Sequence, residues 1–180
     1  MNLYKNILAT DNDFESIHIV VDIPRGSSNK YEYHEEDGYY TLDRVLHSQM
    51  FYPFDYGFIP QTIGEDGDAI DVALLTTYPT FTGCVVKGRI IGYIDCHDES
   101  GGDAKIIAVP TENIDPRWSE YQSFENIPQH TQKELLLHFK EIKKLEETKY
   151  HKVTITGFGS KEKAIEIIKK AHERYKKSHT

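Results

Sequence analysis

Three carboxylates fall within six residues in the segment Asp66-Gly67-Asp68-Ala69-Ile70-Asp71. Like charges this close repel one another unless a cation or protons neutralise them. Hard divalent cations prefer oxygen ligands, so the segment favours a site for Mg²⁺, Mn²⁺ or Ca²⁺ over a zinc site. An EF-hand is excluded, because Ile70 takes its fifth position and no Glu takes its twelfth. A solvated, Asp-rich surface turn explains the same residues equally well.

A second acidic group lies further along the chain, at Asp95, Asp98, Glu99 and Asp103. Two glycines stand between Asp98 and Asp103 and favour a turn that folds both carboxylates toward one point. A solvated hairpin tip is the alternative interpretation. Combined with the first group, the second could complete a site for more than one metal ion.

Basic residues are scarce in this part of the chain. Only eight precede position 131, and three of them stand beside acids: Lys30 near Glu32, Arg44 after Asp43, and Lys105 near Asp103. Exposed ion pairs of this kind commonly contribute less than about 1 kcal/mol to stability. The functional alternative is a phosphate site, in which Lys and Arg bind oxygens that also bridge metal ions.

The chain has 180 residues and a net charge of −8, which is unevenly distributed. Residues 1–130 carry a balance of −14 and residues 131–180 a balance of +6. An acidic body argues against nucleic acid as a partner, because nucleic-acid surfaces carry basic stripes. It leaves open a protein that gathers metal cations, although charge alone favours a solvated acidic surface.

The length suits one domain over residues 1–180. We expect no membrane association, because no apolar run is long enough for a spanning helix. The N-terminal residues turn acidic before a signal-type stretch can form, and Cys84 and Cys96 are too few for a disulfide framework. These features predict a cytoplasmic protein with reduced thiols.

Alternating apolar and polar residues indicate the strands that must position these groups. Strands are expected over residues 17–23, 30–34, 39–46, 70–75, 84–94, 104–109 and 151–156. Asp37-Gly38 would form the turn between the second and third, and Gly88 and Gly92 would mark bulges or bends. Within residues 30–34, Lys30 and Glu32 share one face.

Two helices are expected in the C-terminal half. One is capped by Thr131 with Glu134 and buries Leu135, Phe139 and Ile142. The other begins at Ser160 and ends near Lys177. Short strands followed by helices predict an α+β, mainly β fold, with a small barrel and the helices packed outside it.

In their order along the chain, the motifs resemble those of the family I soluble inorganic pyrophosphatases. They are Lys30-Tyr31-Glu32, Asp43-Arg44, residues 50–57, Asp66-Gly67-Asp68 with Asp71, Asp98, Asp103-Ala104-Lys105 and Val109-Pro110. The resemblance runs from about residue 17 to the last expected helix. It implies an OB-like five-stranded barrel and, for the short bacterial type, a cytoplasmic homohexamer.

The resemblance also implies an activity, the Mg²⁺-dependent hydrolysis of pyrophosphate, which is bound as its Mg²⁺ complex. Several Mg²⁺ ions, or Mn²⁺ in their place, would be held by five carboxylates: Glu32, Asp66, Asp71, Asp98 and Asp103. The basic residues Lys30, Arg44, Lys105 and Lys143 would bind the phosphates, and Tyr52 would line the site beside them. Asp68 would take a proton from a metal-bridging water as general base, with Tyr56 tuning it. Metal ions would reverse the field of the acidic pocket, so that it attracts an anion.

Three positions depart from the family pattern. Asp22 stands where Glu is usual, and a carboxylate withdrawn by ~1.5 Å can cost on the order of 100-fold in rate. Ala69 replaces a common Pro or Glu and is expected only to loosen the turn. Ile142 replaces the Tyr before the phosphate-binding Lys, which predicts about 10- to 100-fold weaker phosphate stabilisation. Tyr150 is a substitute donor that nothing in the sequence positions.

Asp22 and Ile142 support a second hypothesis, in which the chain is a catalytically weakened paralogue that binds metal and phosphate as an interaction module. A third, an OB-type binder of single-stranded nucleic acid, is disfavoured, because such grooves are cationic and residues 1–130 are acidic.

Overall fold

The computed structural model describes residues 1–98, 101–150 and 154–179, and the side chains of Asp98 and Lys149 lie outside the described part. Five strands close into a barrel in the order β1 (Ser16–Ile23), β4 (Asp55–Ile59), β5 (Ile70–Leu74), β8 (Lys105–Pro110) and β6 (Val85–Asp98). Pairing of β6 with β1 completes the ring. Neighbours are antiparallel except β5 and β8, which are parallel. The predicted mainly β, five-stranded barrel is confirmed.

The alternating strands form where the sequence predicts them, but β4 does not follow from alternation. All five of its residues are buried, so it shows no polar face. Gly57 lets β4 approach β1 closely, because a Cβ atom there would lie 1.9 Å from the carbonyl oxygen of Val20. Burial on both faces therefore conceals this strand in the sequence.

Strand β6 is longer than predicted and pairs with different partners along its length. Its first half pairs with β1, and its second half pairs with β9 (Thr154–Gly159) and the short β7 (Gly101–Gly102). The register against β8 shifts between Ile90 and Gly92, which confirms the irregularity at Gly92. Gly88 pairs regularly with Pro110, so the structure has no bulge there. Residues 151–153 of the predicted last strand lie outside the described residues.

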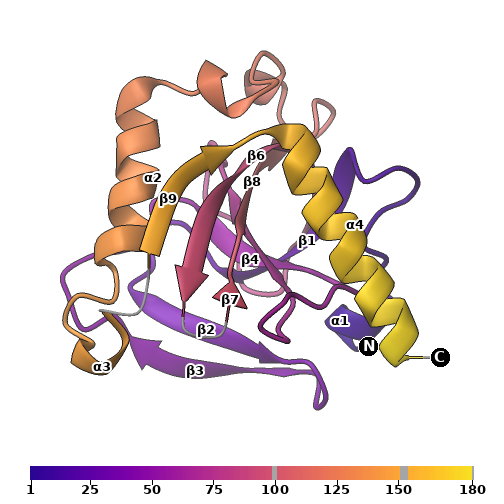
Figure 1. Cartoon of the computed structure of the whole chain (residues 1–180), viewed down its shortest axis with the longest axis horizontal. Coiled ribbons are helices and arrows are strands. Elements are labelled where there is room, and N and C mark those ends of the chain that lie inside the picture. Colours follow the sequence, from indigo (N-terminus) through magenta and orange to yellow (C-terminus); the bar gives the residue numbers. More distant parts are fainter. Residues whose placement is uncertain (99–100, 151–153, 180) are drawn as a thin grey trace.

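A separate hairpin of β2 (Asn29–His34) and β3 (Tyr39–Val45) lies below the barrel in the view of Figure 1. Gly38 has φ +77° in the turn between them, a conformation that favours glycine. The short helix α1 (Leu3–Asn6) contacts the hairpin, because the Leu3 amide donates to the Tyr33 hydroxyl at 2.7 Å. The hairpin carries several of the predicted site residues away from the barrel wall.

Helices α2 (Gln129–Glu141) and α4 (Lys161–Ser178) pack against the outside of the barrel, as predicted (Figure 1). Ser160 caps α4, and its hydroxyl accepts from the Lys163 amide. The capping box predicted at Thr131 is wrong: α2 begins two residues earlier, with Pro128 at the N-cap position. The shorter helical segments are η1 (Pro116–Trp118), η2 (Phe124–Asn126) and α3 (Glu147–Tyr150).

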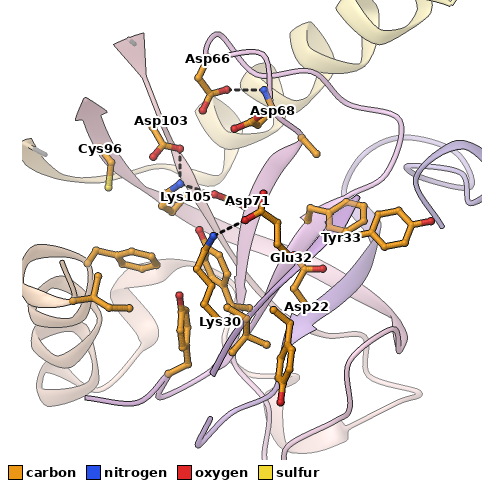
Figure 2. Close-up of a pocket in the computed structure, with 18 of the residues that line it drawn as sticks. Asp22, Lys30, Glu32, Tyr33, Asp66, Asp68, Asp71, Cys96, Asp103 and Lys105 are labelled. Carbon is orange, nitrogen blue, oxygen red and sulfur yellow. Dashed lines mark hydrogen bonds and ion pairs between the residues drawn. The ribbon is translucent and has the colours of Figure 1, made fainter. Parts of the chain in front are cut away.

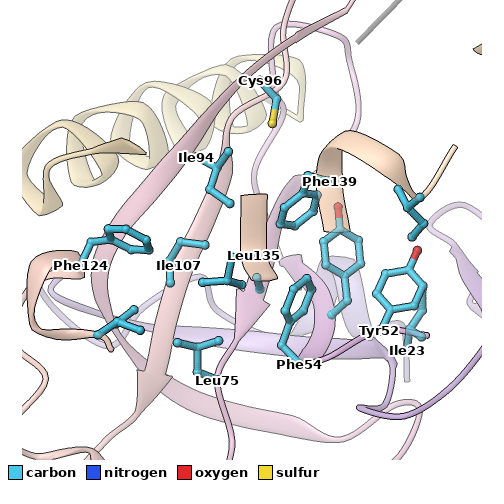
Figure 3. Packing of buried hydrophobic residues seen from close by; sticks show 14 of the residues in the cluster. Ile23, Tyr52, Phe54, Leu75, Ile94, Cys96, Ile107, Phe124, Leu135 and Phe139 are labelled. Carbon is cyan, nitrogen blue, oxygen red and sulfur yellow. The ribbon is translucent and has the colours of Figure 1, made fainter. Parts of the chain in front are cut away.

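Two apolar clusters hold the helices to the barrel. Leu135 and Phe139 of α2 pack in a cluster with Phe54 and Tyr52 and with Ile94 of β6 and Ile107 of β8 (Figure 3). Ala164, Ile168 and Ala171 of α4 pack on the other cluster, which includes Ile17 and Ile19 of β1. Among the described residues, no helix combines the length and the apolar character needed to cross a bilayer.

Candidate active site

The predicted site residues come together in one pocket of about 490 Å³ at an end of the barrel (Figure 2). Its walls come from β2 and β3, the loop between β4 and β5, the start of β8 and the C-terminal end of α2. The lining includes every predicted site residue except Asp98: Asp22, Lys30, Glu32, Arg44, Tyr52, Tyr56, Asp66, Asp68, Asp71, Asp103, Lys105, Ile142 and Lys143. The Asp98 side chain lies outside the described residues.

The acidic loop before β5 turns tightly at Gly67, where φ is +97°. The Asp68 amide donates to the Asp66 carboxylate at 3.1 Å, and the Asp68 carbonyl accepts from the Gly64 amide at 2.6 Å. The Ile70 amide donates to the Thr62 hydroxyl at 3.1 Å, where β5 begins. These bonds direct Asp66 and Asp68 to the same side as Asp71 (Figure 2).

Lys105, the first residue of β8, stands between the two acidic groups. Its Nζ atom lies 2.5 Å from the Asp71 carboxylate and also donates to the Asp103 carboxylate. In the parallel pair of β5 and β8, Val72 lies opposite Ile106. The residues just before them, Asp71 and Lys105, are therefore brought close together. Burial alone would lower the pKa of Lys105, but the charges of Asp71 and Asp103 outweigh it and raise that pKa. Lys105 is therefore a fully charged partner of both carboxylates.

Asp66 and Asp68 also line the pocket, and neither forms an ion pair among the described residues. Burial raises the pKa values of Asp66 and Asp68, and the nearby charge of Asp71 raises that of Asp68 further. Burial also raises the pKa of Asp103, although Lys105 opposes the shift. Oxygen donors with uncompensated negative charge fit hard divalent cations. In the described part of the chain, however, no group of three or more Asp, Glu, His or Cys side chains is arranged closely enough to hold a metal ion.

The hairpin supplies the cationic side of the pocket. Lys30 contacts Glu32 at 3.0 Å and Asp43 at 2.9 Å, so Lys30 and Glu32 do lie side by side on β2. Arg44 pairs with Asp43, and its Nε atom lies 3.0 Å from the buried Glu146 carboxylate. Glu146 was not predicted as a partner of the site. It joins β3 to the segment after α2.

Two tyrosines form the floor beside the acids. Burial, together with the charges of Asp71 and Asp103, raises the pKa of the buried Tyr56 hydroxyl. Tyr52 is also buried, with its ring 5.4 Å from the Tyr56 ring. Burial raises the pKa of Tyr52 as well. Both hydroxyls therefore stay protonated near neutral pH and are available as neutral hydrogen-bond donors.

The family departures at Asp22 and Ile142 both lie on the pocket wall. One carboxylate oxygen of Asp22 is buried and has no hydrogen-bond partner among the described residues. Burial and the charge of Asp71 raise the pKa of Asp22 well above its usual value. Ile142 is buried with Phe139 in the apolar cluster under α2. Tyr150 donates instead to Glu141 at 3.4 Å and does not line the pocket.

Comparison with known proteins places this geometry in a family. A sequence model of the inorganic pyrophosphatases matches residues 19–176. The chain belongs to the inorganic pyrophosphatase family. It is similar to the inorganic pyrophosphatase of Saccharolobus solfataricus, with 44% identity over 162 residues, 90% of this chain and 93% of that protein. The Thermus thermophilus protein is 42% identical over 172 residues, covering 96% of this chain and 97% of its own.

Solved inorganic pyrophosphatases share the fold over nearly the whole chain. The Thermus thermophilus structure superposes with a TM-score of 0.91 at 40% identity and covers 98% of this chain and 99% of its own. The Helicobacter pylori structure gives a TM-score of 0.89 at 36% identity, covering 96% and 99%. These findings confirm the family resemblance, the fold and the enzyme class, inorganic diphosphatase.

His138 and Glu35 line the pocket of this family member but were missed in the sequence. His138 is buried against Tyr52 and Phe54, and neither ring nitrogen has a partner among the described residues. Burial lowers the pKa of His138 to about 3. Its spacing from Leu135 and Ile142 puts it on the buried face of α2, which helical periodicity alone could have indicated.

Replacing His138 by Phe is expected to stabilise the protein, because a buried imidazole without partners is replaced by an apolar ring. The gain is about 1 kcal/mol at pH 7. It grows by roughly 2 kcal/mol at pH 5, because the unfolded His takes up a proton that the folded one does not. Urea unfolding of wild-type and H138F at both pH values measures it. The exposed His130→Phe on the same helix is the control and should change little; equal stability of H138F and wild-type at pH 5 would contradict the burial argument.

Proposed function

We propose that this chain hydrolyses inorganic pyrophosphate to two phosphates with Mg²⁺, and that Asp68 is the general base. The observation that carries the proposal is one pocket in which unneutralised carboxylates face Lys30, Arg44 and Lys105. Relatives of 42–44% identity over nearly the full chain are named inorganic pyrophosphatases, which supports the substrate.

The residues present fit divalent cations. Glu32, Asp66, Asp71 and Asp103 line the pocket with oxygen donors, and Asp98 is proposed as a further ligand by the family motif. Mg²⁺ is the hard cation that best suits carboxylates and phosphate oxygens, and Mn²⁺ accepts the same donors. When bound, such ions would screen the charge of the polyanionic substrate and lower the pKa of a coordinated water.

The chain's own side chains then bind and orient the phosphates. Lys30 and Lys105 already hold carboxylates within 3.0 Å, so both cations are directed into the pocket. Arg44 is fixed by Glu146 and, with Lys143 at the end of α2, is proposed to bind equatorial phosphate oxygens. Tyr52 would close the wall beside them.

Asp68 is proposed to take the proton of the attacking water. It is an exposed residue of the pocket wall, and its raised pKa brings it closer to the range in which a general base works best at neutral pH. Tyr56 lines the same pocket and is proposed to tune the base with its neutral hydroxyl.

We also propose that residues 1–180 act as one domain in a cytoplasmic homohexamer without nucleic acid partners. Leu42, Val45 and Phe51 are more than half exposed near the hairpin, which supports burial against another copy. Light scattering after size-exclusion chromatography measures the assembly.

A second candidate is a weakened paralogue that binds metal and phosphate without efficient turnover. The unpartnered oxygen of Asp22 and the apolar Ile142 favour it, because neither supplies the longer carboxylate or the hydroxyl usual in the family.

Purified protein with Mg²⁺ should release phosphate from pyrophosphate, and excess EDTA should abolish the release. Asp68→Asn should lower kcat by about 10²- to 10⁴-fold, because the amide cannot accept the proton. The matched control is Asp13→Asn, an exposed residue outside the pocket, which should retain full activity. Turnover that persists in both EDTA and D68N would overturn the mechanism.

The double variant Asp22→Glu/Ile142→Tyr separates the two candidates. If the chain is an efficient enzyme, restoring the family residues should change kcat by no more than about 3-fold. A rise of about 100-fold or more would instead identify the wild-type chain as the weakened paralogue. Steady-state phosphate release at saturating Mg²⁺ pyrophosphate makes the comparison.

A further inference from the structure

The N-terminal segment, residues 2–6, comprises α1 and its cap and hydrogen-bonds to elements from both sides of the pocket. One side is the hairpin, which carries Lys30 and Glu32, and the other is the acidic loop between β4 and β5. We propose that Asn2 and Tyr4 are positioning residues that hold the hairpin and the acidic loop at the separation that the substrate requires. The inference rests on the proposed function, because it concerns the binding of Mg²⁺ pyrophosphate.

Asn2 ties the N-terminal segment to the turn end of the hairpin, beside which α1 lies (Figure 1). The Asn2 side-chain amide donates to the Glu35 carbonyl at 2.6 Å, while its side-chain oxygen accepts from two backbone amides of α1 and caps that helix. The Leu3 amide donates to the Tyr33 hydroxyl at 2.7 Å. Both acceptors follow Glu32 along the chain, so these bonds hold the strand that carries the pocket residues.

The opposite end of the hairpin is joined to the barrel. Residues 24–28 continue directly from β1, and there the Gly26 amide donates to the Tyr52 carbonyl at 2.8 Å. The Tyr52 amide donates to the Ser27 carbonyl at 3.0 Å. A two-stranded hairpin by itself is only marginally stable in water. The N-terminal segment therefore adds a second point of attachment, at the end far from the barrel.

Tyr4 ties the N-terminal segment to the chain that leads into the acidic loop. Its buried hydroxyl donates to the Thr62 carbonyl at 2.7 Å. The Thr62 hydroxyl in turn accepts from the Ile70 amide at 3.1 Å, immediately before Asp71. The Tyr4 ring is fixed edge-on against Tyr175 of α4, with 5.4 Å between the ring centroids. Two hydrogen bonds through one buried residue thus link the N-terminal segment to the start of β5.

The backbone at Gln61 shows that this turn depends on contacts with other elements. Gln61 has φ +54°, a left-handed conformation that residues with a Cβ atom rarely adopt. Its backbone amide donates to the Tyr4 carbonyl at 3.2 Å, and its side-chain amide donates to the Lys5 carbonyl at 3.1 Å. The Nδ1 atom of His172 in α4 lies 2.7 Å from the Gln61 carbonyl. Because strained backbone persists only where its surroundings hold it, α1 and α4 together fix the approach to the acidic loop.

The separation of the two sides matters for a ligand that contacts both. The pocket residues are Lys30 and Glu32 on the hairpin side, and Asp66, Asp68 and Asp71 on the side of the acidic loop and β5. Binding across the pocket costs less conformational entropy when the two sides are already in place. Loosening the N-terminal segment should therefore weaken binding and raise KM. The bound complex reaches the same geometry, so kcat should be retained.

Two conservative variants, Asn2→Ser and Tyr4→Phe, test the proposal. Serine can still cap α1 but is too short to reach the Glu35 carbonyl as well, and phenylalanine keeps the buried ring without its hydroxyl. Each variant should raise KM for Mg²⁺ pyrophosphate by about 3- to 10-fold and leave kcat within about 2-fold. The matched controls are Asn12→Ser and Tyr39→Phe, at exposed residues outside the pocket, which should keep the wild-type KM.

Amide hydrogen exchange in EDTA gives a readout that does not depend on activity. The Gly38 amide, which donates to the His34 carbonyl in the hairpin turn, should exchange about 5-fold faster or more in N2S. The Ile70 amide should do the same in Y4F, whereas the amides of β1 should keep their wild-type rates.

Three results would overturn the positioning role: a wild-type KM in both variants, a fall in kcat with KM unchanged, or an equal acceleration of exchange in β1. With an active wild-type, each of them contradicts this inference alone. An inactive wild-type would overturn the proposed function and this inference with it.

Discussion

Repulsion among carboxylates gathered at one end of the barrel is the constraint on which the rest of the structure depends. Asp71 lies on β5 and Asp103 in the loop before β8, and they share Lys105, whose position follows from the parallel pairing of β5 with β8. Asp66 and Asp68 are held on a short loop by backbone hydrogen bonds. The protein thus uses main-chain bonds and one buried cation to collect charges that would otherwise separate. The same collection attracts divalent cations, and through them an anion.

Different elements of the fold supply different residues of the pocket. The barrel fixes Tyr56, Asp71 and Lys105, whereas the separate hairpin brings Lys30, Glu32 and Arg44. Helix α2 covers the site with an aromatic cluster that includes His138, whose ring nitrogens have no partner in the described part of the chain. The acidic balance of residues 1–130 is therefore not a uniformly charged surface, because several of its acids line one pocket.

Much of this organisation could be predicted from the sequence, where local pattern and tertiary environment agree. Alternating Ile17, Ile19, Val21 and Ile23 indicated β1, and Ser160 marked the start of α4. Strand β4 was concealed because both of its faces are buried, and α2 begins before Thr131 because Pro128 can precede a helix without a side-chain cap. The acids and cations of the site carried recognisable motifs. His138 and Glu146 did not, because their positions in the site arise from contacts with distant residues.

The central claim is that the pocket is an incomplete charge arrangement that divalent cations complete. Thermal unfolding in EDTA and in Mg²⁺, at equal ionic strength, tests it most directly. At pH 7.5, saturating Mg²⁺ should raise Tm by about 5–10 °C, because it binds only the folded carboxylates. At pH 4 the gain should largely disappear, since the raised pKa values of Asp66, Asp68 and Asp103 leave these carboxyls more protonated in the folded state. An unchanged Tm at pH 7.5, or the same gain at both pH values, would contradict the account.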